Sequence, residues 1–150
     1  MVSLTVFTPT YNRADLLQRC FESMKRQTNK NFIWLIIDDG STDNTREAVE
    51  LWQRELLDFT LRYIYKENGG LHTAYNEAIA NIDTELCVCI DSDDFMPDDA
   101  VEKILSFWEK NGSPEVAGIV GLDYDPQYPP PPGSHSSPRR RGSSPPRRRA

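Results

Sequence analysis

The chain has 150 residues, which suits one domain with its own core. Residues 1–125 carry all 23 Asp and Glu side chains but only 11 of the 17 Lys and Arg side chains. Such an acidic body argues against a nucleic-acid groove on this part, because contacts to backbone phosphates need Lys and Arg. No apolar run reaches the roughly 20 residues of a membrane span, so no transmembrane segment is expected.

The first 125 residues alternate between short apolar runs and amphipathic segments. The apolar runs predict strands at 4–8, 32–37, 61–65, 86–90 and 116–120. Helices are expected between these strands, with starts near Asn12, Ser41 or Thr42, Gly69 and Pro97. Asn12, followed three residues later by Asp15, is expected to cap the first of these helices. Continuous apolar strands between amphipathic helices are typical of an α/β fold whose parallel sheet is covered on both faces.

The three cysteines do not indicate a disulfide framework, because their number is odd and two of them lie in one strand. Cys87 and Cys89 are expected to share a face of that strand and to pack in the core. No basic segment precedes the first apolar run, so no signal peptide is expected. We therefore expect a cytoplasmic protein, and peripheral attachment to the inner face of a membrane stays open.

Polar clusters follow three of the expected strands, at 8–12, 38–41 and 91–94. In parallel sheets, ligands bind outside the carboxyl ends of the strands. Because three such clusters would meet at one edge of one sheet, we expect a single site and not three unrelated loops.

The cluster with the strongest signal holds Asp91, Asp93 and Asp94, directly after the apolar run 86–90. An Asp-rich turn that bonds its own backbone is the alternative interpretation. However, three acids in four residues repel one another unless a positive group lies among them. Mg²⁺ or Mn²⁺, together with the phosphates of a nucleotide, would supply that charge.

Asp38 and Asp39 end the second expected strand. A helix cap would explain only one polar side chain there, and Ser41 or Thr42 already supplies it. The surplus carboxylates could accept hydrogen bonds from a uracil imino group or from ribose hydroxyls. Tyr11 could offer its ring to a base, although a loop aromatic that covers the sheet edge is the simpler interpretation.

Four motifs, read in order, are Thr-Pro-Thr-Tyr-Asn-Arg at 8–13, Asp-Asp-Gly-Ser-Thr-Asp at 38–43, Asn-Gly-Gly at 68–70 with Ala74 and Asn76, and Asp-Ser-Asp-Asp at 91–94. Over residues 2–125 this pattern resembles the family 2 glycosyltransferases of the GT-A fold. The resemblance implies a mostly parallel sheet with helices on both faces, incomplete at the C-terminus. It also implies a nucleotide-sugar-binding domain over 1–125.

The resemblance implies a role beside the donor nucleotide for nine residues: Pro9, Thr10, Tyr11, Asp38, Asp39, Gly70, Asn76, Asp91 and Asp94. It makes Asp93 the metal ligand, although the division of roles among the three acids of 91–94 stays open. The implied cofactor is Mn²⁺ or Mg²⁺.

The implied activity is metal-dependent, inverting transfer of a hexosyl group from a nucleotide-diphospho-sugar, with UDP as the expected nucleotide. The acceptor would be a hydroxyl of a saccharide or of a lipid-linked acceptor, as in polysaccharide biosynthesis. The donor sugar, the acceptor, the linkage and the oligomeric state are not indicated.

Two departures from the family pattern stand out. Tyr75 occupies a position where many relatives carry Arg. The family's acceptor half, which supplies the catalytic base, has no match here, so the base is unassigned and poor transfer is expected. Residues 126–150, rich in Pro, Ser and Arg, are expected to be disordered. They suggest a truncation followed by foreign or frame-shifted sequence.

Two other functions stay open. A nucleotidyltransferase would share the acidic metal site, but it would usually need a glycine-rich basic loop after the first strand. The second alternative is a nucleic-acid-binding module that acts through the Arg triplets at 139–141 and 147–149.

Overall fold

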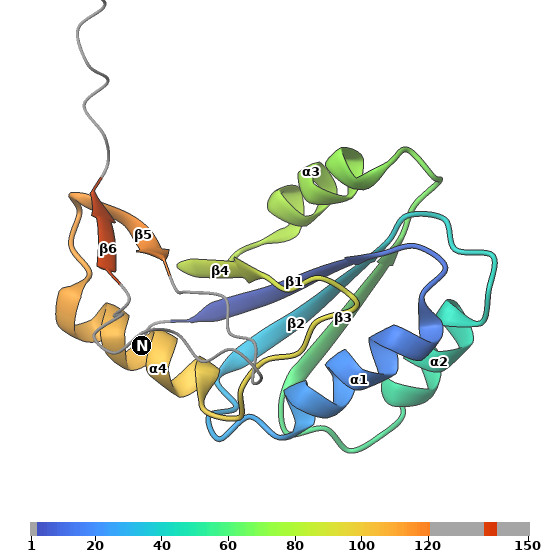
Figure 1. The fold of residues 1–150 in the computed structure, drawn as a ribbon, viewed down its shortest axis with the longest axis horizontal. Helices are drawn as coiled ribbons and strands as arrows, with labels where there is room; N and C mark the ends of the chain where they lie inside the picture. The colour runs from blue at the N-terminus through green and yellow to red at the C-terminus, as the bar shows by residue number, and fades with distance from the viewer. Residues whose placement is uncertain (1–2, 121–136, 141–150) are drawn as a thin grey trace, which may run out of the picture. The chain divides into compact units, whose positions relative to one another are not determined.

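The computed structural model describes residues 3–120 and 137–140 (Figure 1). The chain divides after Leu105 into two compact units. The elements of the first unit, in chain order, are β1 (Leu4–Thr10), α1 (Ala14–Lys25), β2 (Phe32–Asp38), α2 (Thr45–Trp52), β3 (Thr60–Tyr65), α3 (Leu71–Asn81), β4 (Leu86–Cys89) and the start of α4 (Ala100–Asn111). The second unit holds the end of α4 with β5 (Val116–Val120) and β6 (Ser137–Arg140).

The first unit is built on a parallel sheet with the strand order β3-β2-β1-β4. Strands β1 and β2 run in register from Leu4 opposite Phe32 to Thr10 opposite Asp38. Strand β3 continues this register, so that Tyr65 ends opposite Asp38. The carboxyl ends of these three strands are therefore level, which brings the loops that follow them to one edge, as the sequence predicts.

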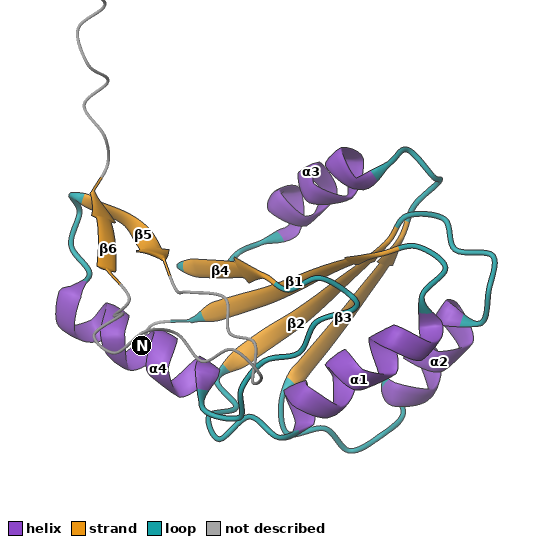
Figure 2. Cartoon of the chain, in the orientation of Figure 1, coloured by secondary structure: helices purple, strands orange, loops and turns teal. Residues whose placement is uncertain are grey.

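Helices cover both faces of this sheet, with α3 on one side and α1 and α2 on the other (Figure 2). Alternate residues of β1 and β2 explain the two layers. Val6 and Trp34 face the layer of α1 and α2, and Trp34 is fully buried there. Phe7 and Leu35 point the opposite way and pack against the small Ala74 of α3. The small side chain allows α3 to lie close to the sheet.

Strand β4 is less buried than the sequence predicts. It lies at the edge of the sheet and pairs with β1, and its Cys87 side chain is exposed while Cys89 is half-buried. Core packing was the expectation for both thiols, and it is wrong for Cys87. The physical reason is the position of the cover, because α3 packs mainly over β1 and β2 and meets β4 through the contact of Tyr75 with Cys89.

The second unit differs from the sequence prediction in its strands. Strand β5 has the predicted bounds, but it pairs antiparallel with β6 and not with the parallel sheet. Residues 137–140 lie in the segment that was expected to be disordered, and here they form β6 because an extended segment can pair with the backbone groups of β5. The rest of that segment lies outside the described residues.

No helix within the described ranges is both long and apolar enough to cross a bilayer.

Candidate functional site

A cavity of about 560 Å³ opens at the carboxyl ends of β1, β2 and β4. Its wall includes six of the nine residues that the resemblance places beside the nucleotide, Pro9, Thr10, Tyr11, Asp39, Gly70 and Asp91, together with the expected metal ligand Asp93. It also includes Arg13, Asn68, Leu71, Ala74 and Ser92. The loops after all four strands, β1, β2, β3 and β4, thus contribute to one cavity, as the level strand ends allow.

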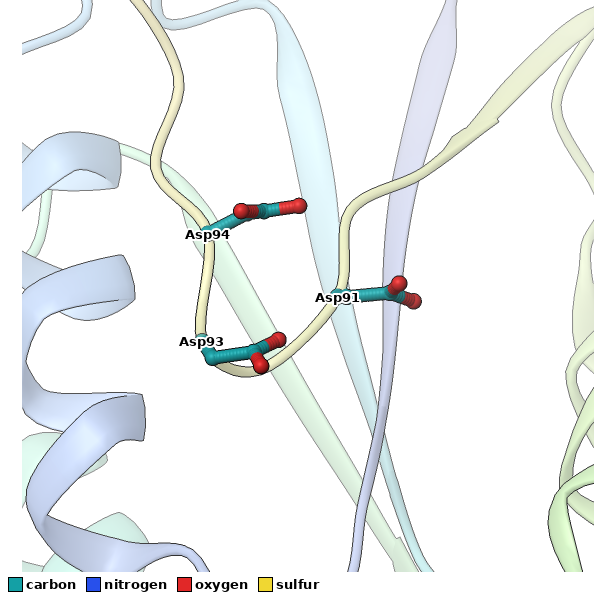
Figure 3. Close-up of side chains that lie close together, drawn as sticks. All are labelled: Asp91, Asp93 and Asp94. Carbon is teal, nitrogen blue, oxygen red and sulfur yellow. The ribbon is translucent and has the colours of Figure 1, made fainter. Parts of the chain in front are cut away.

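The acidic cluster consists of Asp91, Asp93 and Asp94, in the turn after β4 (Figure 3). One carboxylate oxygen from each lies within 4.8 Å of the others, and all three side chains are exposed. The backbone N–H of Asp94 donates to the carbonyl of Asp91 at 3.0 Å, which closes the turn. Their exposure leaves the carboxylates in contact with solvent, but the mutual repulsion of three close carboxylates remains, as the sequence argument expects.

The chemistry of this cluster fits a hard divalent cation. Carboxylate oxygens are the ligands that Mg²⁺ and Mn²⁺ prefer, and the cluster has an open side toward solvent. In this structure the guanidinium of Arg13 lies 3.0 Å from a carboxylate oxygen of Asp93. Both side chains are about half exposed, so this pair contributes little to stability. It shows that Asp93 can be reached by a positive group from the cavity side.

Asp39 is the buried anion of the site, with 4% of its surface exposed. The backbone N–H groups of Gly69 and Gly70 donate to its two oxygens at 3.1 and 2.8 Å. Lys66 donates a further hydrogen bond to the same carboxylate. Burial opposes ionisation of Asp39, but the donors from Lys66, Gly69 and Gly70 outweigh it and lower the pKa of this carboxyl.

The contacts of Asp39 predict that its contribution to the free energy of unfolding depends on pH. Because the pKa of Asp39 is lowered in the folded protein, its carboxylate stabilises the fold above the unfolded pKa of about 3.9. This contribution is lost as the pH falls through the folded value. We expect Asp39→Asn to lower the free energy of unfolding by about 2–3 kcal/mol at neutral pH.

The cost of Asp39→Asn should shrink steadily in acid, which urea denaturation of both proteins at several pH values would measure. A cost that stays the same from neutral pH to the acid limit would contradict this role for Asp39.

Asp38 lies elsewhere than the sequence suggests. It is fully buried, and its carboxylate accepts the backbone N–H of Ser41 at 2.8 Å and the hydroxyl of Tyr63 at 2.6 Å. Burial and this hydrogen bond raise the pKa of Tyr63, so its hydroxyl stays protonated as a donor. Asp38 does not contribute to the cavity wall. Its contacts with Ser41 and Tyr63 hold the turn after β2, and its role beside the nucleotide stays a prediction.

Asn76 also lies away from the cavity wall, on an exposed part of α3. Gly70, by contrast, is in the wall with a φ of +91°, a conformation that other residues rarely adopt. Thr10 combines two features of a binding group. It lines the cavity, and its buried hydroxyl has no hydrogen-bond partner among the described residues. A buried hydroxyl without a partner is costly, so a polar ligand would stabilise it.

Asn12 connects two loops of the site instead of capping α1. It has a φ of +51°, and its side-chain oxygen accepts the backbone N–H of Thr42 at 2.7 Å. Asp43 supplies the caps that the sequence assigned elsewhere. Its carboxylate accepts the N–H of Ala14 at the start of α1 and of Thr45 at the start of α2. Each loop thus holds the other in place beside the cavity.

Gly40 is the position in these loops where a side chain would be least tolerated. Its φ is +84°, and an added Cβ would lie 2.8 Å from the backbone nitrogen of Asn68. We expect Gly40→Ala to lower the free energy of unfolding by about 1–3 kcal/mol, as strained backbone positions do. Gly118→Ala is the matched control, since its Cβ would meet no atom within 4 Å. Equal melting temperatures of the two variants would contradict this expectation.

Five wall residues outside the predicted set are Arg13, Asn68, Leu71, Ala74 and Ser92. All of these except Leu71 belong to the motifs noted in the sequence, so their neighbours could have indicated them. Leu71 follows Gly70 at the first position of α3 and is exposed. No sequence signal separates it from an ordinary helix residue. Lys66 was also missed, although it pairs with Asp39.

A family profile and individual related sequences both match this chain, and all of them are glycosyltransferases. The sequence profile "Glycosyl transferase family 2" matches residues 5–149, a range that includes the segment after residue 125 in which no family motif was recognised. An uncharacterized glycosyltransferase of Rickettsia felis is 39% identical over 108 residues, which cover 72% of this chain and 17% of that protein. Glycosyltransferase GlyA of Streptococcus pneumoniae is 35% identical, with 67% of this chain and 14% of that protein covered. The chain spans less than a fifth of both relatives.

Solved structures agree with this result. A mannosyltransferase, PcManGT from Pyrobaculum calidifontis in complex with GDP-Man and Mn²⁺, matches with a TM-score of 0.72 and 27% identity. The match covers 83% of this chain and 36% of that one. TarS 1-349 of S. aureus in complex with UDP matches with a TM-score of 0.66 and 25% identity, over 73% of this chain and 32% of that one.

Proposed function

Because the chain belongs to glycosyl transferase family 2 and has its GT-A α/β fold, we propose that its cavity binds a nucleotide-diphospho-sugar. In the complete activity, the sugar would pass to a hydroxyl of a saccharide or of a lipid-linked acceptor. The observation that carries this proposal is the shared wall of the cavity. It unites the loop after β1, the buried carboxylate of Asp39 and two aspartates of the acidic cluster.

The nucleotide would lie on the side of the cavity formed by the loop after β1. Tyr11 is in the wall and 48% exposed, so its ring is available to a base. The hydroxyl of Thr10 is free to bind a polar atom of the ligand. Both oxygens of Asp39 already accept the backbone N–H groups of Gly69 and Gly70. A contact of Asp39 with the base would therefore also involve this glycine loop.

The diphosphate would lie at the acidic cluster. Asp93 would hold Mn²⁺ or Mg²⁺, with Asp91 or Asp94 beside it, and a bound cation would neutralise charge on the leaving diphosphate. Arg13 contacts only one oxygen of Asp93, and its guanidinium lies in the cavity wall, where it could also donate to a phosphate oxygen. PcManGT, which matches this chain, was solved with GDP-Man and Mn²⁺, and that supports a divalent cation here.

The reaction would proceed with inversion, by direct displacement of the diphosphate by an acceptor hydroxyl. Such a hydroxyl is a weak nucleophile at neutral pH, so a base is required. The base is unassigned in this chain, and we expect residues 1–150 to bind the donor without efficient transfer. Efficient transfer by this chain alone would contradict that expectation.

Isothermal titration with UDP, with and without Mn²⁺, tests the proposed function. We expect binding that strengthens at least tenfold when Mn²⁺ is present, since the cation would link the acidic cluster to the diphosphate. GDP in a parallel titration separates the two bases, and a preference for UDP would support the uridine assignment. Failure of both nucleotides to bind in the presence of Mn²⁺ would overturn the proposal.

A further inference from the structure

A short chain of side chains connects α3 to the acidic cluster. The hydroxyl of Tyr75 lies 3.1 Å from the Cys89 sulfur, and that sulfur lies 3.9 Å from a carboxylate oxygen of Asp91. Cys89 ends β4, and Asp91 follows two residues later in the cavity wall. The thiol is therefore placed between a helix residue and a member of the acidic cluster.

The direction of these hydrogen bonds follows from chemistry. An ionised carboxylate can only accept, so the thiol of Cys89 must donate to Asp91. The sulfur is then left to accept, and the Tyr75 hydroxyl donates to it. We call these two hydrogen bonds the relay: the Tyr75 hydroxyl donates to the Cys89 sulfur, and the Cys89 thiol donates to the Asp91 carboxylate.

The side chain of Tyr75, where the relay begins, is fixed by packing against the sheet. Tyr75 lies on α3, and its ring meets the Phe7 ring edge-on, with 5.4 Å between ring centroids and an interplanar angle of 89°. Phe7 is buried in β1, where it packs with Ala74 and Ala78 of the same helix. The tyrosine hydroxyl is thus fixed by the packing of α3 on the sheet.

We propose that Tyr75 and Cys89 are positioning residues that orient the Asp91 carboxylate for a divalent cation. This inference rests on the proposed function, because it concerns the same acidic cluster. Groups that hydrogen-bond to metal ligands restrict the orientation of those ligands, and their removal typically weakens metal binding about 10–100-fold. Hydrogen bonds of sulfur are weak, so we expect the low end of this range.

Mn²⁺ binding measured by electron paramagnetic resonance, which reports free Mn²⁺ directly, tests this inference in the presence of saturating UDP. Cys89→Ala should weaken Mn²⁺ binding about tenfold, while UDP binding without metal stays unchanged. Cys89→Ser keeps a donor and an acceptor and should restore most of the affinity. Tyr75→Phe removes only a hydroxyl and should cause a loss of a few fold.

The matched control is Cys87→Ser, because Cys87 is exposed on the same strand and precedes Cys89 by two residues. It should leave Mn²⁺ binding unchanged. Wild-type Mn²⁺ affinity in both Cys89→Ala and Tyr75→Phe would overturn the inference. An equal loss in Cys87→Ser would also overturn it, since the effect would then belong to the strand in general.

The outcomes separate this inference from the proposed function. If the wild-type protein binds no UDP with Mn²⁺, the proposed function fails and the inference fails with it. If the wild-type protein binds both and the Tyr75 and Cys89 variants match it, only the relay is refuted. Thermal melting of each variant identifies any that unfolds, and Tyr75→Phe then carries the test because it leaves the ring packing on Phe7 intact.

Discussion

Replacement of Asp93 by Ala is expected to abolish most of the Mn²⁺-dependent part of UDP binding. Asp93 is the member of the acidic cluster that lines the cavity and that a cationic side chain already reaches. Loss of groups that merely orient metal ligands costs about 10–100-fold in affinity, so loss of a direct ligand should cost about 100-fold or more. UDP binding without metal should change little. Titration calorimetry of the wild-type protein and of Asp93→Ala measures the affinity for UDP with Mn²⁺ and without it.

The fold should survive this change, because Asp93 is exposed and its ion pair with Arg13 is screened by solvent. Asp98→Ala is the matched control. Asp98 is also exposed and also pairs with an arginine, Arg26, at 3.1 Å, but it is outside both the cluster and the cavity wall. If UDP binding by Asp93→Ala depended on Mn²⁺ as in the wild-type protein, the acidic cluster would not be the metal site. An equal loss in Asp98→Ala would contradict the metal role in the same way.

Replacement of Trp34 by Ala should have the largest effect on stability. Trp34 is fully buried at the centre of β2, and its ring stacks on Phe21 and Trp52, with centroids 6.0 and 6.1 Å away. Removal of a buried tryptophan leaves a cavity that the neighbours fill only in part. We therefore expect a loss of about 3–5 kcal/mol in the free energy of unfolding, measured by urea denaturation.

Trp34→Phe separates packing from hydrogen bonding at this position. The indole N–H of Trp34 donates to the hydroxyl of Thr8 at 3.0 Å, and both groups are buried. The phenylalanine variant keeps most of the ring contact but leaves this hydroxyl without its donor, so an intermediate loss is expected. If the alanine and phenylalanine variants were equally unstable, the hydrogen bond would outweigh the packing.

The sequence predicts the sheet and the place of the site because both follow from periodicity. Buried parallel strands are apolar throughout, as in β2, and their carboxyl ends must meet at one edge. This is why Asp39 and Asp93 could be assigned to one cavity although 54 positions separate them in the sequence.

The features that the sequence did not predict depend on neighbours in space. The cap that Asp43 makes on α1 spans 29 positions, and a local motif gave no reason to prefer it over Asn12. Cys87 is exposed because β4 ends the sheet, and strand order is not encoded in the strand's own composition. Asp38 and Asp39 look equivalent in the sequence, yet alternation along β2 and the turn after it direct only Asp39 to the cavity.

The carboxylate of Asp39 has a consequence for how this cavity would bind the proposed nucleotide. Gly69 and Gly70, two residues with little intrinsic restraint, are already tied to it before anything enters the cavity. A glycine segment left free would have to lose its conformational entropy at the moment of association and would weaken binding accordingly. In this protein the two glycines are ordered during folding, before a ligand binds. The buried carboxylate of Asp39 would therefore contribute both to ligand affinity and to the stability of the fold.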